Sequence, residues 1–280
     1  MTVFHWGELA VQAKAGLSAR ATAVSRLVQP VLPDGADDFL AQQYLLVVGA
    51  QADDGRLWAS MFAGAPGFVS APDDESVLVR ARLAADDPVE PMTRHEGKLG
   101  LLAIDLRTRV RLRMNGTATP RPDGLRLAID QSFPNCPKYI QRRSVAGRAE
   151  QGEAGPGVSA LIAGADTFFV ASVSESGDLD VSHRGGEPGF VEVLSPNRLR
   201  WPDYRGNGML MTLGNITEDP RAALLFVDWA TGTTLQLTGR AEVRWAEESG
   251  SRAVEFEIED VVYRPGSLGI RMAGSSARAS

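Results

Sequence analysis

The chain has 280 residues, a formal net charge of -6 at pH 7, and hydrophobic and charged fractions of 44% and 23%. This length allows two domains with separate cores, and the composition is that of a globular protein. The negative charge, without a basic stripe, disfavours a nucleic-acid partner, and the lack of any run of eighteen apolar residues disfavours a membrane span.

The first half of the sequence predicts two helices followed by a series of short strands. Apolar residues recur at helical spacing over residues 8–28, and Pro30 and Pro33 end this helix. A second short helix is expected over 35–43. The Asp54-Gly55 pair predicts a hairpin turn, because glycine supplies the positive φ of a tight turn. Strands are expected at 44–50, 57–62, 76–81, 99–106, 110–118 and 125–130.

The second half of the sequence predicts the same order of strands. Residues 144–160 are rich in Ala, Gly, Glu and Ser and predict a flexible linker. A helix is expected over about 208–217, and residues 273–280 are expected to form a disordered tail. Strands are expected at 167–173, 179–183, 190–194, 198–201, 222–229, 233–244 and 253–262.

A sequence repeat relates the two halves. Pro66-Gly67-Phe68-Val69 recurs letter for letter as Pro188-Gly189-Phe190-Val191, and Leu101 to Asp105 aligns with Leu224 to Asp228. A repeat of this period indicates two copies of one folding unit, and many short strands indicate small closed barrels. We therefore expect a mainly β fold with short helices, in which two tandem barrels pack as an internal pseudo-dimer. The expected parts are a helical segment 1–36, a first barrel 37–143, the linker 144–160 and a second barrel 161–272.

Few residues of the sequence offer chemistry on their own. Cys136 is the only cysteine, and no basic region followed by an apolar stretch opens the chain; we therefore expect a cytoplasmic protein without an internal disulfide. Cys136 is either a reactive thiol or a small buried residue. One cysteine and three dispersed histidines offer no metal-ligand spacing, so no metal site is expected. Basic clusters at Arg107 to Arg113 and at Arg142-Arg143 either serve a small anionic ligand or are solvated surface.

Several segments together resemble one known family. They are Asp180 to Gly186, Trp201 to Asn207, Leu213 to Ile216, Asp219 to Phe226 and Leu235 to Ala241, with Phe4 to Gln12 and Phe133 to Arg143 in the first half. In this order they resemble the pyridoxamine 5′-phosphate oxidase-like family of FMN-binding split β-barrels, in its tandem-barrel branch. The resemblance implies FMN in a groove of the second barrel, covered by residues 133–143 of the first.

The resemblance also implies which residues hold the cofactor. Ser182, His183 and Arg184 would run beside the isoalloxazine ring, and Gln236 would offer a side chain to it. Lys138, Tyr139 and Arg142 would cover the cofactor. The ribityl phosphate would be surrounded by Trp201, Asp203, Arg205, Asn207 and Thr212. Physical chemistry favours this place, because a phosphate needs N–H donors and positive charge, and Arg205-Gly206-Asn207-Gly208 precedes a helix start.

The differences between the two copies predict one flavin per chain. Ser60-Met61-Phe62 stands in the first copy where the second has Ser182-His183-Arg184, and Ala81 to Pro88 replaces the segment Trp201 to Gly208. Met209 and Met211 stand where relatives often carry a basic residue and an acidic or amide residue. Arg184, Arg205, Lys138 and Arg142 are therefore expected to hold the phosphate.

The resulting hypothesis is an FMN-dependent oxidoreductase that acts on an unidentified small molecule, with hydride transfer through flavin N5. His183 is the candidate catalytic residue, as a proton donor or substrate contact; the alternative is a polar strand residue whose backbone matters more. Electrons would leave to oxygen or arrive from a nicotinamide donor. The alternative function is a non-catalytic flavin- or haem-binding carrier, and a third possibility is a structural protein without cofactor. A homodimer is possible.

Overall fold

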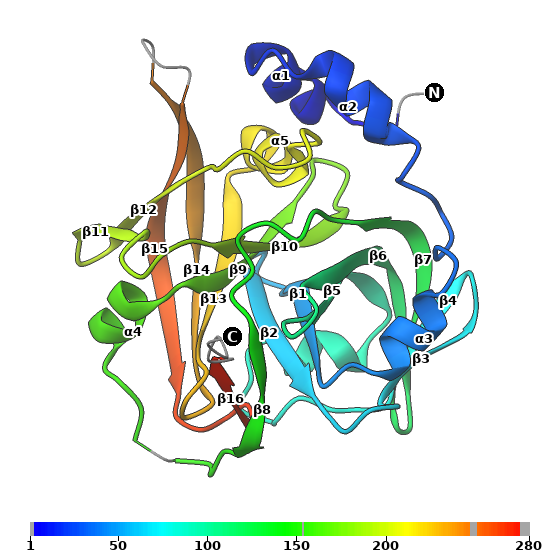
Figure 1. Ribbon diagram of the computed structural model, residues 1–280, viewed down its shortest axis with the longest axis vertical. Helices are drawn as coiled ribbons and strands as arrows, with labels where there is room; N and C mark the ends of the chain where they lie inside the picture. Colours follow the sequence, from blue (N-terminus) through cyan, green and yellow to red (C-terminus); the bar gives the residue numbers. More distant parts are fainter. Residues whose placement is uncertain (1–2, 153, 247–250, 275–280) are drawn as a thin grey trace, which may run out of the picture.

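The computed structural model describes residues 3–152, 154–246 and 251–274 (Figure 1). Within these ranges the chain forms two seven-stranded antiparallel sheets and one two-stranded ribbon, with short helices at their edges. The prediction of a mainly β protein built from two tandem split barrels is therefore confirmed. No described helix is both long and apolar enough to cross a membrane.

The two sheets have the same topology, strand for strand. The first contains β1 Leu45–Gln51, β2 Leu57–Ala63, β3 Val69–Asp73, β4 Ser76–Val79, β5 Gly97–Asp105, β6 Val110–Arg121 and β7 Gly124–Pro134, in the order β2-β1-β5-β6-β7-β4-β3. The second contains β9 Thr167–Val173, β10 Leu179–Gly185, β11 Glu192–Ser195, β12 Arg198–Pro202, β13 Arg221–Asp228, β14 Thr233–Trp245 and β15 Arg252–Arg264, in the matching order β10-β9-β13-β14-β15-β12-β11.

The copies share even a local irregularity. The β6–β7 register shifts between Asn115 and Gly116, and the β14–β15 register shifts between Thr238 and Gly239. A Cβ atom on Gly116 would lie 1.9 Å from the carbonyl oxygen of Ala128, and one on Gly239 would lie 2.0 Å from that of Glu257. Only glycine fits where the bulge brings two backbones this close, so the repeated glycine has a structural reason.

Three apolar clusters explain why the barrels pack together. Alternate residues of β1 point to opposite faces, so Leu46 and Val48 enter the core of the first barrel while Leu45 and Val47 enter a cluster shared with the second. In that shared cluster a Cβ atom on Gly49 would lie 2.6 Å from Cγ2 of Val181. The second barrel has its own core. The buried layer between the two sheets makes the chain an internal pseudo-dimer.

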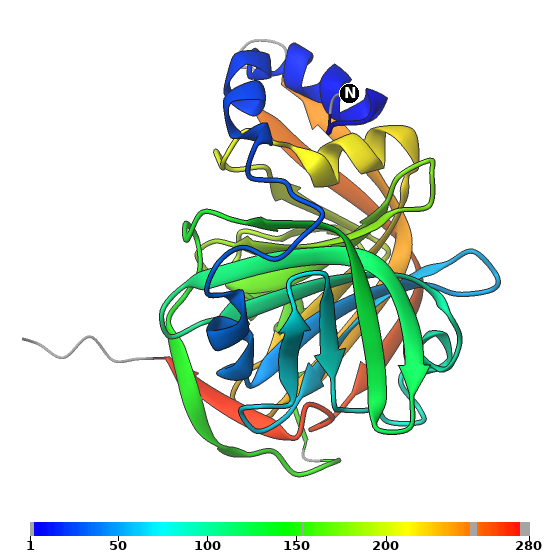
Figure 2. The same cartoon turned by 90° about the vertical axis from the view of Figure 1, so that its right-hand side faces the viewer.

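The helices at the N-terminus differ from the prediction. The single helix expected over 8–28 is two helices, α1 Trp6–Lys14 and α2 Ser18–Ser25, because Gly16 at φ +66° breaks the chain direction between them. Figure 2 shows both helices lying over α5, Met211–Glu218, on the second barrel. Helix α3, Ala36–Ala41, confirms the short helix predicted over 35–43.

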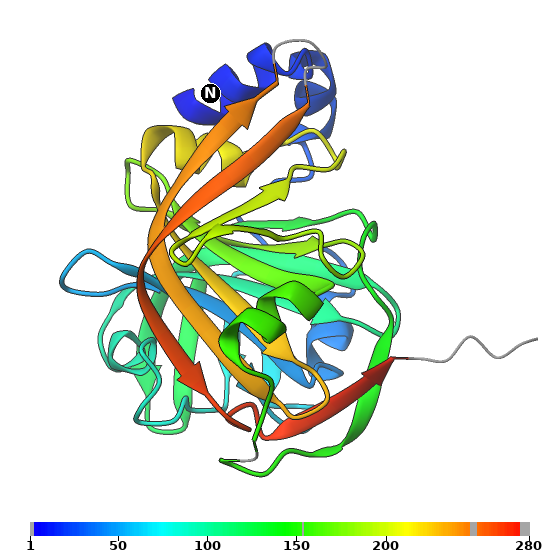
Figure 3. The same cartoon turned by 90° about the vertical axis from the view of Figure 1, so that its left-hand side faces the viewer.

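The expected linker 144–160 is only partly irregular. It overlaps β8, Arg143–Arg148, which pairs with β16, Ile270–Gly274, and the start of α4, Val158–Gly164. Figure 3 shows this ribbon at the end of the molecule opposite α1. The partner of β8 lies far along the chain, which no local pattern reveals. β16 also includes residues 273 and 274 of the expected tail, whereas the prediction for 275–280 lies outside the described residues.

Candidate functional site

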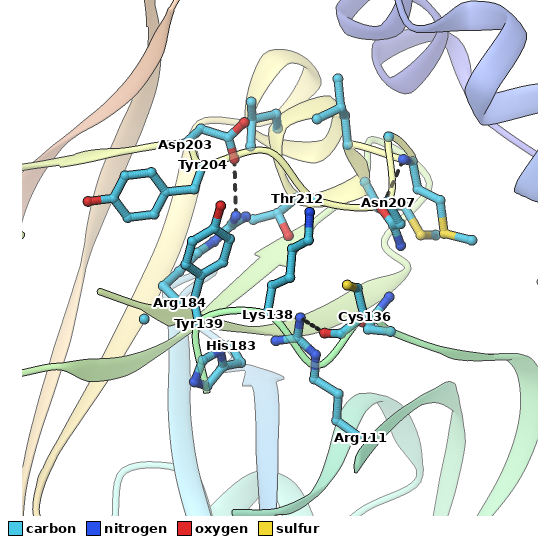
Figure 4. Close-up of a pocket in the computed structure, with 18 of the residues that line it drawn as sticks. Arg111, Cys136, Lys138, Tyr139, His183, Arg184, Asp203, Tyr204, Asn207 and Thr212 are labelled. Atoms are coloured by element: carbon cyan, nitrogen blue, oxygen red, sulfur yellow. Dashed lines mark hydrogen bonds and ion pairs between the residues drawn. The ribbon is translucent and has the colours of Figure 1, made fainter. Parts of the chain in front are cut away.

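A pocket lies between the two barrels, where the first barrel meets the start of α5 (Figure 4). The space between its lining atoms is about 800 Å³ when the open solvent at its mouth is included. The first barrel contributes β6 and residues 133–139, and the second contributes β10 and residues 202–213. The structure thus brings together seven predicted site residues: Lys138, Tyr139, His183, Arg184, Asp203, Asn207 and Thr212.

The start of α5 forms one wall of this pocket. Leu210 precedes the helix at φ +58°, a left-handed conformation that is strained for leucine, and no side chain caps the helix start. Asn207 Oδ1 accepts a hydrogen bond from the Met209 N–H at 3.0 Å, which fixes the turn before the helix. The uncapped first turn therefore presents backbone N–H donors and the positive end of the helix dipole to the pocket.

The N-terminal helices hold this wall in place. Gln12 Nε2 donates to the carbonyl of Met209 at 2.7 Å, and Arg20 Nε donates to that of Asn207 at 2.9 Å. Helix α1 lies so close to α5 that a Cβ on Gly7 would be 2.4 Å from the carbonyl oxygen of Gly214. The segment Phe4 to Gln12 was part of the family resemblance without a role; the structure gives it one.

Four cationic side chains line the pocket, and two of them have carboxylate partners. Arg184 Nη1 donates to Asp203 Oδ1 at 3.1 Å, and Arg113 Nη1 donates to Asp180 Oδ2 at 2.8 Å. In the part of the chain that the structure describes, Lys138 and the half-buried Arg111 form no ion pair. The pocket therefore has an excess of positive charge.

Arg111 is held in an unfavourable environment. Its Nη2 donates to the backbone carbonyl of Cys136 at 2.5 Å, whereas its buried Nε finds no acceptor among the described residues. Burial first, and then repulsion from Arg113 and Arg184, lowers the pKa of Arg111 to about 9. Arg111 remains charged at neutral pH, so an anion beside it would be stabilised.

His183 is neutral at physiological pH. Its side chain lies on β10 and is 6% exposed, and its Nε2 has no partner in the described structure. Burial, followed by repulsion from Arg111 and Arg184, lowers its pKa well below 6.5. A neutral imidazole with one free nitrogen can accept or donate a single hydrogen bond, or ligate a metal.

Two tyrosines from opposite barrels meet at the mouth of the pocket. The rings of Tyr139 and Tyr204 stack with centroids 5.0 Å apart and planes inclined by 25°. Tyr139 adopts a left-handed backbone conformation, φ +64°, in the covering segment. The carbonyl oxygen of Tyr139 lies so near β10 that a Cβ on Gly185 would come within 2.1 Å of it. Tyr139 of the first barrel therefore lies against β10 and Tyr204 of the second.

Five predicted site residues lie elsewhere. Ser182 lies behind the pocket wall and hydrogen-bonds Thr212 at 3.0 Å, and Trp201 packs in the core of the second barrel. Arg142 and Arg205 are exposed and do not line the pocket. Gln236 is fully buried outside the pocket, in contact with Ala59 and Asp87. These positions follow from the barrel geometry, which a linear motif does not encode.

The pseudo-two-fold symmetry between the two barrels explains the place of Gln236. Its Nε2 donates to the carbonyl of Ala59 at 3.0 Å and to Asp87 at 3.3 Å, at the position that mirrors the pocket. The repeat aligns Gln236 with Arg113, and Arg113 is the residue that lines the pocket. The sequence left the cluster Arg107 to Arg113 open as an anion site or solvated surface. It did not place Arg111 and Arg113 at the cofactor, because each barrel sends this strand to the site formed with its partner's groove.

The mirrored position is filled by a buried polar network. Asp87 accepts hydrogen bonds from Ser60 Oγ at 2.6 Å and from Arg264 Nη1 at 2.7 Å. Ser60 is the counterpart of Ser182, and Asp87 comes from the segment that replaces the glycine-rich turn of the second copy. The two halves of the pseudo-dimer are therefore unequal, with an open cationic pocket on one side and a closed ion pair on the other.

A tandem split barrel with one cationic pocket between its halves is thus the class of protein that the fold and site define. Residues 155–263, which include almost all of the second barrel, match the family model described as pyridoxamine 5′-phosphate oxidase. No curated protein matches the chain.

Similar solved structures include two from bacteria. A putative pyridoxamine 5′-phosphate oxidase from Lactobacillus delbrueckii is 18% identical with a TM-score of 0.31, and covers 41% of this chain and 98% of its own. HutZ, the heme storage protein from Vibrio cholerae, is 10% identical with a TM-score of 0.32, and covers 40% of this chain and 95% of its own.

Proposed function

We propose that the pocket binds FMN and that the protein is a flavin-dependent oxidoreductase acting on a small molecule. The observation that carries this proposal is the pairing of an uncapped helix start with Lys138, beside buried polar atoms that lack partners. A phosphate monoester needs several N–H donors and positive charge, and both are present at the start of α5. Figure 4 shows the Lys138 amine pointing toward Thr212 in the first turn of that helix.

The rest of the pocket suits the ring system of a flavin. Among the described residues, neither Nε2 of His183 nor Nε of Arg184 has a hydrogen-bond partner, and the polar edge of an isoalloxazine would offer one. The stacked rings of Tyr139 and Tyr204 lie at the mouth of the pocket. When bound, the flavin would supply hydride chemistry, and the chain's residues would position it and set its electrostatic surroundings.

His183 would hold a hydrogen bond to the cofactor or substrate as a neutral group, because its pKa lies well below 6.5. It would therefore not be a strong proton donor at neutral pH. Oxygen would accept electrons from the reduced flavin, or a nicotinamide donor would supply electrons to the oxidised flavin. Anaerobic reduction by a nicotinamide, followed by reoxidation in air, would separate an enzyme from a carrier.

His183 also supports a second candidate function. A neutral buried imidazole with a free Nε2 is the group that haem iron takes as an axial ligand, so a haem-binding carrier is the alternative. The absorbance spectrum of the purified protein distinguishes the two, since flavin and haem have different bands. Replacement of His183 with glutamine would abolish a haem spectrum but only perturb a flavin one.

The direct test compares FMN with riboflavin, which lacks the phosphate. Lys138→Ala is expected to weaken FMN binding by about 10- to 100-fold, since a hydrogen bond to a charged group contributes about 1.5–3 kcal/mol. Riboflavin binding should stay unchanged. Lys14→Ala is the matched control, because Lys14 lies outside the pocket over the Trp245 ring. Equal losses for both ligands, or no loss for either, would refute the phosphate site.

A further inference from the structure

The two lining cations that form no ion pair among the described residues, Lys138 and Arg111, lie in different parts of the pocket. Figure 4 shows Lys138 directed toward the helix start, whereas the Arg111 guanidinium lies on the opposite side of Lys138, beside Cys136. Arg113 and Arg184 are already paired with carboxylates. With a phosphate on Lys138, Arg111 is the remaining cation of the pocket without an acidic partner.

The groups around Arg111 favour the binding of an anion. Its Nε and the Nε of Arg113 are buried without acceptors in the described residues, and His183 Nε2 is free nearby on β10. A guanidinium can take two oxygens of one acid group at once, in a planar fork. Leaving such donors unpaired costs free energy in the empty pocket, which a bound oxyanion would recover.

We infer that Arg111 forms a second anion subsite that binds the acid group of the substrate, so that the substrate is a small organic acid. This inference rests on the proposed function, which places the cofactor's phosphate at α5. The stacked tyrosines at the mouth favour a planar body behind the acid group, because aromatic faces pack well against flat conjugated molecules.

The test uses benzoate as the probe and benzamide as its neutral counterpart of similar shape. On the FMN-loaded protein, benzoate should perturb the flavin spectrum saturably and bind at least 10-fold more tightly than benzamide. Arg111→Gln should lower benzoate affinity at least 10-fold, while lowering FMN affinity less than Lys138→Ala does. Benzoate affinity that does not respond to Arg111→Gln would overturn the inference, as would displacement of FMN by benzoate.

A stability measurement separates a binding role from a structural one. Because Arg111 is an uncompensated cation in the unliganded pocket, Arg111→Gln should keep or raise the melting temperature of the protein without ligand. A lower melting temperature would assign Arg111 to the fold and overturn the inference. If the protein binds no FMN, calorimetric titration of the unloaded protein with benzoate still tests Arg111, so the two proposals fail separately.

Discussion

Glu8 is a buried acid whose titration should make stability depend on pH. It lies on α1 against Gly214 of α5 and is 1% exposed, and its Oε2 accepts a hydrogen bond from the His5 N–H at 2.9 Å. Burial raises its pKa from 4.5 to about 7; His5 lowers it, while Asp180 and Glu218 raise it further. Between pH 4.5 and about pH 7, Glu8 keeps a proton in the folded protein that it has released in the unfolded chain.

The sign and size of the effect follow from linkage. An acid with a raised pKa stabilises the fold fully below about pH 4.5 and loses this contribution as pH rises through about 7. At about 1.4 kcal/mol per pH unit, the loss comes to about 3 kcal/mol. Glu8→Gln keeps the shape and removes the titration, so it should gain stability over the natural chain by up to about 3 kcal/mol at pH 8 and little at pH 4.

The assay is urea unfolding followed by tryptophan fluorescence, from pH 4 to pH 8. Glu218→Gln is the contrasting variant. Burial raises the pKa of Glu218, but hydrogen bonds from the Gly7 and Glu175 N–H groups and from His5 outweigh this and lower it. Its contribution is therefore present above its unfolded pKa and lost as pH falls. A difference between Glu8→Gln and the natural chain that is flat in pH would refute the reasoning.

Three further changes test other parts of the structure. Gly214→Ala should weaken both stability and FMN binding, because the new Cβ would lie 2.6 Å from Cα of Glu8 and push α1 off α5; thermal scans and FMN titration measure both. The natural chain should lose stability as pH falls below about 6.5, because His183 takes up a proton there only when the chain is unfolded, and His183→Gln should remove this loss. Urea unfolding across that range measures it; a free energy of unfolding of the natural chain that does not fall with pH would contradict the prediction. Arg264→Met should cost about 3–5 kcal/mol by leaving Asp87 buried without its cation, yet keep FMN affinity; loss of FMN binding with intact stability would contradict this.

Much of the fold could be predicted because the repeat and the alternation of apolar residues are local signals. The matching strand order of the two sheets follows from two copies of one unit, and the burial of β1 on both faces follows from its Leu-Leu-Val-Val run. The pairing of β8 with β16, by contrast, depends on contacts between residues far apart in the chain. The boundaries 37–143 and 161–272, the cytoplasmic location and a homodimer stay predictions.

The site was predictable as far as the motif is continuous in the sequence. Lys138, Tyr139 and the turn before α5, which the resemblance assigns to one site, line the same pocket. Gln236 lies outside the pocket because a pseudo-two-fold axis sends equivalent strands to opposite sites. The alignment that pairs Gly116 with Gly239 also pairs Arg113 with Gln236, so the repeat itself held the signal that would have corrected the prediction.

The central claim is that one of two related positions remains open for a phosphate-bearing flavin while the other is closed by Asp87 and Arg264. Calorimetric titration of the purified, cofactor-stripped protein with FMN tests this most directly. The account predicts one FMN per chain, bound more tightly than riboflavin. Two FMN per chain, or none, would contradict it.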